Sequence, residues 1–163
     1  MQEKNKIPFL GICLGMQCSV IEVSRNLAKL KNANSTEFDE NTKYPVIKIL
    51  DEQKNIKYRG NTMRLGNYKA EIRKNTLAYN LYKTTEIEER HRHRYEMNPE
   101  FIETLEKAGL LVSAYHKKML PEIVEMENHP FFIGVQFHPE FASRPMKAHP
   151  LFKGFVSAAL KNK

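Results

Sequence analysis

The residue with the clearest chemical potential in this sequence is a cysteine flanked by glycines. Cys13 lies in Gly11-Ile12-Cys13-Leu14-Gly15, directly after the apolar run 7–12 and before an amphipathic segment. A strand followed by a glycine-flanked cysteine and then by a helix is the arrangement of a nucleophile elbow. In such an elbow the small neighbouring residues allow a strained turn to close and allow the substrate to approach the nucleophile. The N-terminus of the following helix favours thiolate over thiol, and the backbone N–H of Leu14 is placed to receive an oxyanion. A lone cysteine after a strand is more often structural, so a second signal is needed.

A histidine with a carboxylate two positions further on supplies that signal. His138 and Glu140 lie in Gly134-Val135-Gln136-Phe137-His138-Pro139-Glu140, after the apolar run 131–137. A thiol nucleophile needs a base, and the base needs an orienting group. Glu140 can hold one ring nitrogen of His138 and leave the other for the thiol, although His-Pro-Glu alone also fits a strand-ending turn. Together the two motifs predict a Cys13, His138 and Glu140 site, with no role for Cys18 inside the helix.

The elements that must position these residues alternate between strands and helices. Apolar runs and period-2 patterns predict strands within 7–12, 62–72, 85–96, 110–115, 122–127 and 131–137. Helical periodicity and proline or glycine boundaries predict helices over 16–30, 77–82, 99–108 and 150–160, with a polar break at 32–36. This alternation is typical of an α/β fold, and 163 residues suffice for one domain with a core.

The amino-acid composition limits the expected cellular location and binding partners. No run of 18 apolar residues is present, so no membrane partner is expected, and the two cysteines give no disulfide framework, which favours a reducing, cytoplasmic location. The net charge of +7 comes from 26 basic and 19 acidic residues spread along the chain. Without a nucleic-acid motif this charge indicates a solvated surface, and no nucleic-acid partner is expected.

The motifs resemble a known family. Residues 11–17 and 136–141 are similar to the two signatures of class I (triad-type) glutamine amidotransferases. Three further stretches narrow the resemblance to the CTP synthase family, and it extends from about Pro8 to Leu160. These stretches are Asn32-Ala33-Asn34-Ser35-Thr36-Glu37-Phe38, Asn61-Thr62-Met63-Arg64-Leu65-Gly66 and Glu89-Arg90-His91-Arg92-His93-Arg94-Tyr95-Glu96.

The resemblance implies a fold and a reaction. The fold is a class I glutamine amidotransferase-like (flavodoxin-like) three-layer α/β sandwich. The reaction is hydrolysis of L-glutamine to glutamate and ammonia, for the ATP-dependent amination of UTP to CTP. Cys13 matches the nucleophile that forms a glutamyl thioester, His138 the base, Glu140 its partner, and Leu14 supplies an oxyanion donor.

The resemblance also assigns residues that bind the substrate. Gln17, Glu37 and Arg94 match positions that hold glutamine, whose ammonium pairs with a carboxylate and whose carboxylate accepts a guanidinium fork. Without the resemblance, Glu37 fits a loop or capping carboxylate and Arg94 a solvated basic run. The spacing of His91 and His93 would suit a metal, but no cysteine or carboxylate set completes a site, so no metal is expected.

Other parts of the family pattern are not found in this sequence. The family has further strands and a glycine-rich loop with a second oxyanion donor before the cysteine, whereas Cys13 lies near the start here. We therefore expect an N-terminally truncated domain over 1–163, impaired by roughly 10²–10³-fold if one donor is lost. ATP and Mg²⁺ belong to the absent synthetase domain, and no cofactor is expected in this chain. The expected partners are glutamine and either that domain or a CTP synthase protomer. A GTP effector stays open, because 51–60 is a stretch where the family varies near its GTP-responsive lid, and Asn61 stands where the family usually has a glycine.

Two other interpretations remain at this stage. A non-catalytic fragment that binds a CTP synthase protomer fits the absent loop, although the intact Cys13, His138 and Glu140 argue against it. An amidotransferase of another synthetase, such as the GMP-forming one, would share the two signatures, but the stretch 90–95 argues against that interpretation.

Overall fold

The computed structural model describes residues 6–49 and 63–162, so the stretch 51–60 with Asn61 and Thr62 lies outside the described residues. Within the described part, one sheet has the strand order β1-β9-β8-β7-β4-β5. Strands β1 and β9 are parallel, and the other neighbours are antiparallel. The strands are β1 (Phe9–Ile12), β4 (Arg64–Ile72), β5 (Glu86–His93), β7 (Leu110–His116), β8 (Leu120–Met126) and β9 (Phe132–Val135).

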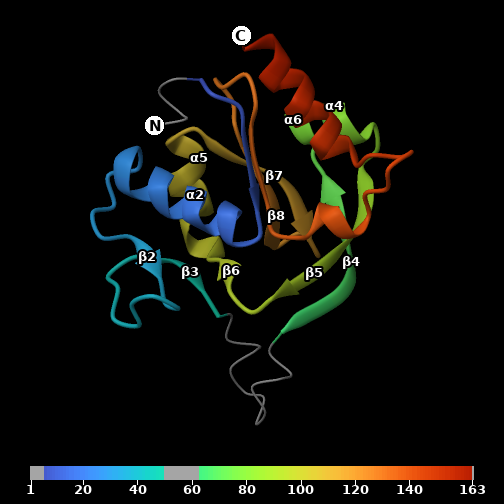
Figure 1. The fold of residues 1–163 in the computed structure, drawn as a ribbon. Coiled ribbons are helices and arrows are strands. Elements are labelled where there is room, and N and C mark those ends of the chain that lie inside the picture. Colours follow the sequence, from blue (N-terminus) through green and yellow to red (C-terminus); the bar gives the residue numbers. More distant parts are fainter. Residues whose placement is uncertain (1–5, 50–62, 163) are drawn as a thin grey trace.

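Helices cover both faces of this sheet, which confirms the predicted three-layer α/β arrangement (Figure 1). Helices α2 (Leu14–Asn26) and α5 (Ile102–Lys107) lie on one face, and α4 (Leu77–Tyr82) and α6 (Pro150–Lys161) lie on the other. Successive strand residues point to opposite faces. Accordingly, Val124 packs in the core under α2 and α5, and its neighbour Ile123 packs in the core under α4 and α6.

Helix α2 brings Met16, Val20 and Val23 into the core, and all three are fully buried, as the predicted helical face requires. The helix ends at Asn26, earlier than the periodicity to residue 30 predicts. The chain then turns through Lys29, whose φ is 59° and therefore left-handed. The hydrophobic periodicity continues past the end of the helix because Leu27 and Leu30, which follow it, also pack against the core.

A small second sheet was not predicted. It consists of β2 (Asn34–Ser35), β3 (Pro45–Lys48) and β6 (Glu96–Met97), in the order β2-β3-β6. Strands of two to four residues are too short to show a period, so the polar break at 32–36 concealed β2. The short 3₁₀ turns η2 (Pro99–Phe101) and η3 (Pro139–Phe141) complete the described elements.

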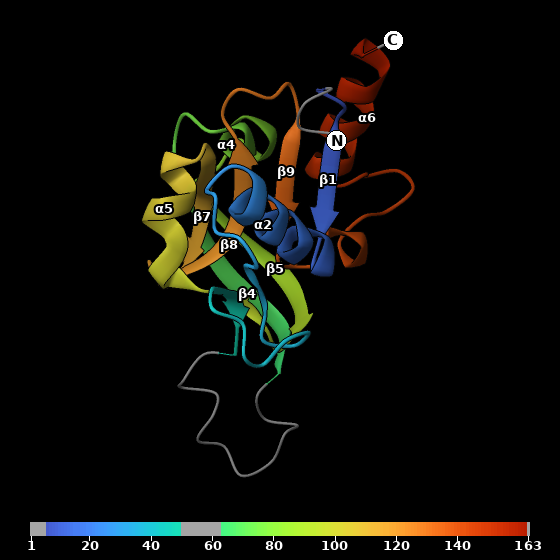
Figure 2. The ribbon, with the colours of Figure 1, turned by 90° about the vertical axis from the view of Figure 1, so that its left-hand side faces the viewer.

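The parallel pair β1 and β9 positions the predicted site. Figure 2 shows the two strands side by side, with α2 beginning where β1 ends. The Cys13 N–H donates to the Val135 carbonyl at 2.8 Å, which places Cys13 beside the end of β9. Because carboxyl ends of parallel neighbours meet at one sheet edge, Cys13 and the segment 136–140 emerge at the same place.

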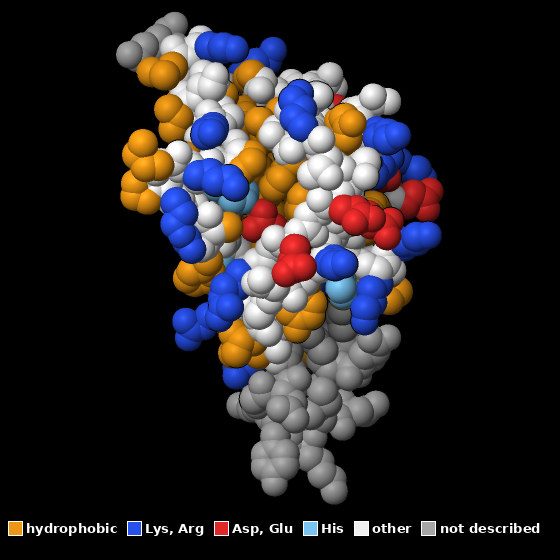
Figure 3. All heavy atoms as spheres, turned by 90° about the vertical axis from the view of Figure 1, so that its right-hand side faces the viewer, with side chains coloured by type: hydrophobic (Ala, Val, Ile, Leu, Met, Phe, Trp, Pro, Cys, Tyr) orange, Lys and Arg blue, Asp and Glu red, His pale blue; other side chains and the backbone are white. Residues whose placement is uncertain are grey.

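On the face drawn in Figure 3, lysine and arginine side chains lie scattered among polar and apolar atoms rather than in one patch. No helix of the described residues is both long and apolar enough to cross a membrane.

Candidate active site

Cys13 occupies a strained turn between β1 and α2. Its φ of 51° and ψ of −104° lie outside the regions that non-glycine residues normally adopt. A Cβ on Gly11 would lie 2.8 Å from the carbonyl carbon and oxygen of Gly15, so only glycine fits there. A Cβ on Gly15 would meet no heavy atom within 4 Å, so this glycine leaves open space. The glycine-flanked cysteine therefore forms the tight turn that its sequence predicts.

His138 and Glu140 form a close pair after β9. The His138 Nδ1 lies 2.7 Å from Glu140 Oε1, and the η3 turn brings the two residues together. The backbone N–H of His138 donates to the Arg90 carbonyl at 2.8 Å and ties the pair to β5. The other ring nitrogen of His138, Nε2, is buried and has no hydrogen-bond partner among the described residues. One nitrogen is thus held by a carboxylate and the other is unoccupied.

A cavity of about 280 Å³ opens at Cys13. Five of the seven predicted site residues line it, whereas His138 and Glu140 are not part of its lining. The lining also includes three residues for which no role was predicted from the sequence. The full set is Cys13, Leu14, Gln17, Glu37, Arg92, His93, Arg94 and Tyr95.

Two opposite charges line this cavity without neutralising each other. The side chains of Glu37 and Arg94 are both exposed, and neither forms an ion pair with another residue of the described ranges. Glu37 is placed by its loop, since its N–H donates to Ser35 Oγ at 3.1 Å. Arg94 directly follows β5. The cavity therefore offers one carboxylate and one guanidinium to a ligand that carries both charges.

A chain of side-chain amides connects the cavity wall to the sulfur. Gln17 Nε2 donates to the Tyr95 carbonyl at 3.0 Å and to Gln136 Oε1 at 3.2 Å. Gln136 Nε2 in turn donates to Cys13 Sγ at 3.8 Å. Gln136 belongs to the 136–141 signature, but no role was predicted for it from the sequence. The available signal was a polar amide near the end of the apolar run 131–137, two residues before His138.

The thiol of Cys13 is not acidified overall. Burial raises the pKa of Cys13, and the backbone N–H of Leu14 lowers it, but burial is the larger effect. The carboxylates of Glu140, Glu96 and Glu37 raise the pKa further. The backbone at the helix N-terminus therefore favours the thiolate, in the predicted direction, but burial outweighs this effect. Forming the thiolate here requires a base that accepts the proton.

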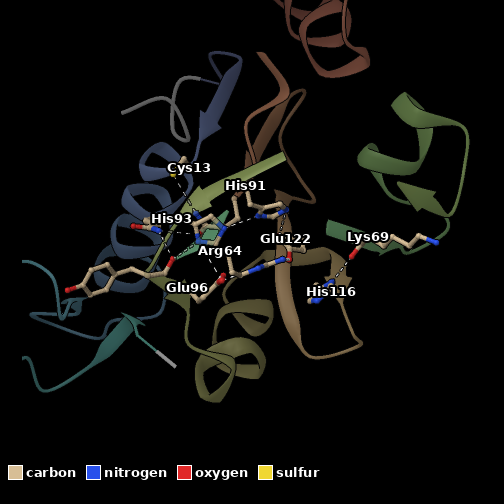
Figure 4. Close-up of polar contacts among 11 residues, drawn as sticks. Cys13, Arg64, Lys69, His91, His93, Glu96, His116 and Glu122 are labelled. Carbon is tan, nitrogen blue, oxygen red and sulfur yellow. Dashed lines mark hydrogen bonds and ion pairs between the residues drawn. The ribbon is translucent and has the colours of Figure 1, made fainter. Parts of the chain in front are cut away.

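A buried charge cluster lies close to the cavity (Figure 4). The Arg64 guanidinium reaches two fully buried carboxylates, with Nη1 3.1 Å from Glu96 Oε1 and Nη2 2.8 Å from Glu122 Oε1. The second contact is close but lacks hydrogen-bond alignment, so it is a charge contact. The Arg64 guanidinium also lies 4.4 Å from the Tyr68 ring centre, within reach of a cation–π interaction.

Two buried imidazoles complete the cluster. His91 Nδ1 lies 2.8 Å from His93 Nε2, and His93 Nδ1 lies 3.2 Å from the Tyr95 carbonyl. His91 Nε2 faces Glu122 Oε2 at 3.6 Å. The described residues contain no group of three or more side chains placed to hold a metal ion. The two histidines instead bond to each other and connect the charge cluster to the cavity wall at Tyr95.

Burial sets the protonation of the cluster. Burial, and then the charge of Arg64, lower the pKa of His91 to about 2 and that of His93 to about 3, so both rings are neutral. Burial raises the pKa of Glu96 to about 7 and that of Glu122 to about 8, although Arg64 opposes the rise. One guanidinium cannot balance two buried carboxylates, so the cluster retains a proton near neutral pH.

We expect the chain to lose on the order of 2 kcal/mol of unfolding free energy between about pH 6 and about pH 9. A carboxyl with a raised pKa binds more protons folded than unfolded. The contribution of Glu96 and Glu122 is therefore fully present below about pH 4.5 and is lost as the pH rises through about 7 and about 8. The lowered pKa values of His91 and His93 act oppositely, because their contribution is lost as the pH falls below about 6.5.

Urea unfolding at a series of pH values measures this dependence. Glu122→Gln should flatten the alkaline part of the curve, because it removes the group with the higher pKa. Glu88→Gln, at an exposed position of β5, should leave the curve unchanged. A wild-type curve that is flat between about pH 6 and pH 9, or an alkaline fall that persists in Glu122→Gln, would contradict the assignment.

Comparison with known proteins identifies the family. The model of the family "Glutamine amidotransferase class-I" matches residues 1–158. The chain therefore belongs to the class-I glutamine amidotransferases. Within this class it is similar to CTP synthases, and the resemblance drawn from its motifs is confirmed.

Two CTP synthases illustrate the similarity. The chain is 55% identical over 163 residues to the CTP synthase of Flavobacterium psychrophilum, covering 99% of this chain and 30% of that protein. It is 57% identical over 161 residues to the CTP synthase of Methanocaldococcus jannaschii, covering 98% of this chain and 30% of that protein. The chain thus spans about three tenths of the length of these relatives.

Solved structures agree. A Trypanosoma brucei CTPS glutaminase domain with bound acivicin has a TM-score of 0.93 at 40% identity, covering 99% of this chain and 63% of that one. A proposed GMP synthase protein from Thermoplasma acidophilum has a TM-score of 0.58 at 15% identity, covering 98% of this chain and 60% of that one, and shares the fold alone. The class I glutamine amidotransferase fold expected from the sequence is confirmed.

Proposed function

We propose that this chain hydrolyses L-glutamine as the amidotransferase part of a CTP synthase, with Cys13 as its nucleophile. The proposal rests on the cavity that combines the Cys13 turn with the Glu37 carboxylate and the Arg94 guanidinium, neither of which forms an ion pair within residues 6–49 and 63–162. Glutamine has an ammonium and a carboxylate at one end and an amide at the other. Glu37 pairs with the ammonium and Arg94 forks onto the carboxylate, while Gln17 helps to fix the amide near Cys13.

The chemistry follows from the groups around the sulfur. Cys13 Sγ attacks the amide carbon of glutamine as its proton passes to His138 Nε2, which is buried and has no hydrogen-bond partner in the described part of the chain. Glu140 holds the ring through Nδ1 and stabilises the imidazolium that forms. The N–H of Leu14 donates to the developing oxyanion. The proton then leaves with ammonia, and water activated by His138 hydrolyses the glutamyl thioester to glutamate.

The ammonia has a proposed destination. The similarity to CTP synthases supports transfer to UTP that is activated by ATP, which makes CTP. ATP and Mg²⁺ would act in the synthetase part of such an enzyme and not at the residues described here. The partner would then be a synthetase domain or a CTP synthase protomer, and a GTP effector remains part of the proposal. The two free thiols favour a reducing, cytoplasmic setting.

Covalent labelling tests the proposal directly. The chain is treated with acivicin or a glutamine-like chloroketone, with increasing glutamine, and adducts are read by intact mass. Labelling that requires Cys13, ignores Cys18 and is blocked by glutamine would support a working glutamine site. Labelling that is absent, or that glutamine does not block, would overturn it.

The two cavity charges make a separate prediction. We expect Arg94→Gln to lower kcat/KM for glutamine by roughly 10- to 100-fold, mainly through KM, because a charge-assisted hydrogen-bond pair to the substrate carboxylate is lost. Arg94→Lys should recover only part of this loss, since lysine keeps the charge without the fork. Lys74→Gln, at an exposed position that does not line the cavity, is the matched control.

For Glu37 the substrate itself supplies the control. Glu37→Gln should weaken glutamine binding to a similar extent, but should cause no further loss with a glutamine analogue that lacks the α-ammonium group. Steady-state assays of both substrates measure this coupling. Equal losses with glutamine and with the analogue would mean that Glu37 does not bind the ammonium.

A further inference from the structure

We propose that Gln136 acts on the nucleophile itself: its side-chain Nε2 donates a hydrogen bond to Cys13 Sγ and stabilises the thiolate. The inference deepens the proposed function, since it rests on Cys13 being the reacting thiol. Gln136 is fully buried, and its Nε2 lies 3.8 Å from Cys13 Sγ, within hydrogen-bond distance for sulfur.

Backbone hydrogen bonds at the ends of β9 and β1 fix the positions of Gln136 and Cys13. Gln136 directly follows β9, and its N–H donates to the Glu122 carbonyl at 2.9 Å. Cys13 directly follows β1, and its N–H donates to the Val135 carbonyl at 2.8 Å. Two neighbouring parallel strands therefore end side by side and deliver the amide and the thiol to the same point.

The hydrogen-bond network decides which end of the Gln136 amide faces the sulfur. A backbone carbonyl can only accept, so Gln17 must turn its NH₂ group to the carbonyl of Tyr95. The same NH₂ group lies 3.2 Å from Gln136, which must therefore present its oxygen. The NH₂ group of Gln136 remains for Cys13. Reversing either amide would set two donors or two acceptors against each other.

The carbonyl of Tyr95 is itself held in place. His93 Nδ1 lies 3.2 Å from it and must carry the hydrogen, because the carbonyl cannot donate. In a neutral ring the other nitrogen, Nε2, then accepts from His91 Nδ1 at 2.8 Å. The Tyr95 carbonyl thus accepts from His93 on the side of the buried charge cluster and from Gln17 in the cavity wall. The orientation of Gln136 is therefore set by several buried contacts and not by its own rotamer alone.

This donor compensates for the environment of the thiol. Burial and nearby carboxylates disfavour the charged sulfur, and the N–H of Leu14 is one group that opposes them. Gln136 adds a second N–H from the side of β9. It acts twice in the proposed reaction, because the sulfur is charged when it attacks the amide and again when it leaves the thioester.

The pH dependence of Cys13 alkylation tests the proposal without glutamine. Iodoacetamide labelling is followed by intact mass in a Cys18→Ser background, so that one thiol is read. Relative to the Cys18→Ser chain that keeps Gln136, Gln136→Met should raise the pH midpoint of Cys13 alkylation by about one pH unit. This shift corresponds to roughly tenfold less thiolate near pH 7. Gln136→Glu keeps the shape, places a carboxylate at the sulfur, and should raise the midpoint further.

Controls separate this effect from folding and from the proposed function. Ser24→Ala removes another buried hydrogen bond of α2 and should leave the midpoint unchanged. Equal midpoints in the Gln136 variants and wild type would overturn the proposal. If neither Gln136 variant folds, Gln17→Met serves instead, because it removes the hydrogen bond that Gln136 Oε1 accepts. It must then raise the midpoint of Cys13 alkylation, and an unchanged midpoint would overturn the proposal. A shifted midpoint in a chain that does not hydrolyse glutamine would support the role of Gln136 and contradict the proposed function. An unshifted midpoint in a chain that hydrolyses glutamine would support the proposed function and contradict the role of Gln136.

Discussion

The Cys13→Ala variant is expected to hydrolyse glutamine roughly 10⁴–10⁶-fold more slowly than the unchanged chain, because the thioester can no longer form. Release of ammonia, measured with a coupled glutamate dehydrogenase assay, gives the rate. Cys18→Ala should keep the full rate, since Cys18 is exposed on α2 and does not line the cavity. Cys13 lies in the turn directly before α2 and Cys18 lies within α2, so the two cysteines form a matched pair.

A double variant extends this prediction to the base. If His138 acts only on the thiol of Cys13 and on the thioester it forms, Cys13→Ala with His138→Ala should be about as slow as Cys13→Ala alone. Independent roles would instead make the two losses multiply. A Cys13→Ala variant that keeps more than about a tenth of the rate would refute a covalent mechanism at this cysteine.

The parts of the site that could be predicted are those with local causes. The Cys13 turn follows from an apolar strand and from Gly11, whose replacement would collide with the next turn of backbone at 2.8 Å. The His138 and Glu140 contact follows from a spacing of two residues around a proline, which closes a 3₁₀ turn. The helices and the strands of the six-stranded sheet could also be predicted, because each shows its period within one segment, whereas the strands of the small sheet are too short to show one.

The parts that could not be predicted have causes distant in sequence. The direction of the Cys13 pKa depends on burial, which several elements create together, and the local helix effect is outweighed. Arg64, Glu96 and Glu122 come from β4, β6 and β8, so no spacing reveals their cluster. Alternation placed His91 and His93 on one face of β5, but their hydrogen bond to each other appears only in three dimensions.

That cluster makes the largest stability prediction. Arg64→Met is expected to lower the free energy of unfolding by about 3–5 kcal/mol near neutral pH, since it removes the only cation that contacts two fully buried carboxylates in the described part of the chain. Methionine retains much of the apolar volume, so the loss of charge dominates. Urea unfolding measures the change.

An exposed ion pair provides the matched control. Arg73 also contacts a carboxylate at 2.8 Å, but side-chain exposures of 47% and 32% for Arg73 and Glu106 leave that pair in contact with water. Arg73→Met should therefore cost no more than about 1 kcal/mol. Equal losses from the two variants would mean that burial does not decide the strength of the Arg64 contacts.

The pH dependence of the Arg64→Met loss reveals its origin. Below about pH 6 both carboxyls carry protons in the folded chain, since their pKa values are about 7 and about 8, and the variant loses mainly hydrogen bonds. Above about pH 8 the carboxylates of the wild-type chain are charged and contact Arg64. In the variant they must either be buried without a counter-charge or remain protonated at a pH that favours their ionisation. The loss should therefore grow as the pH rises, and adding Glu122→Gln to Arg64→Met should recover part of it. A loss independent of pH would assign the stabilising role of Arg64 to packing against Tyr68, and not to its charge.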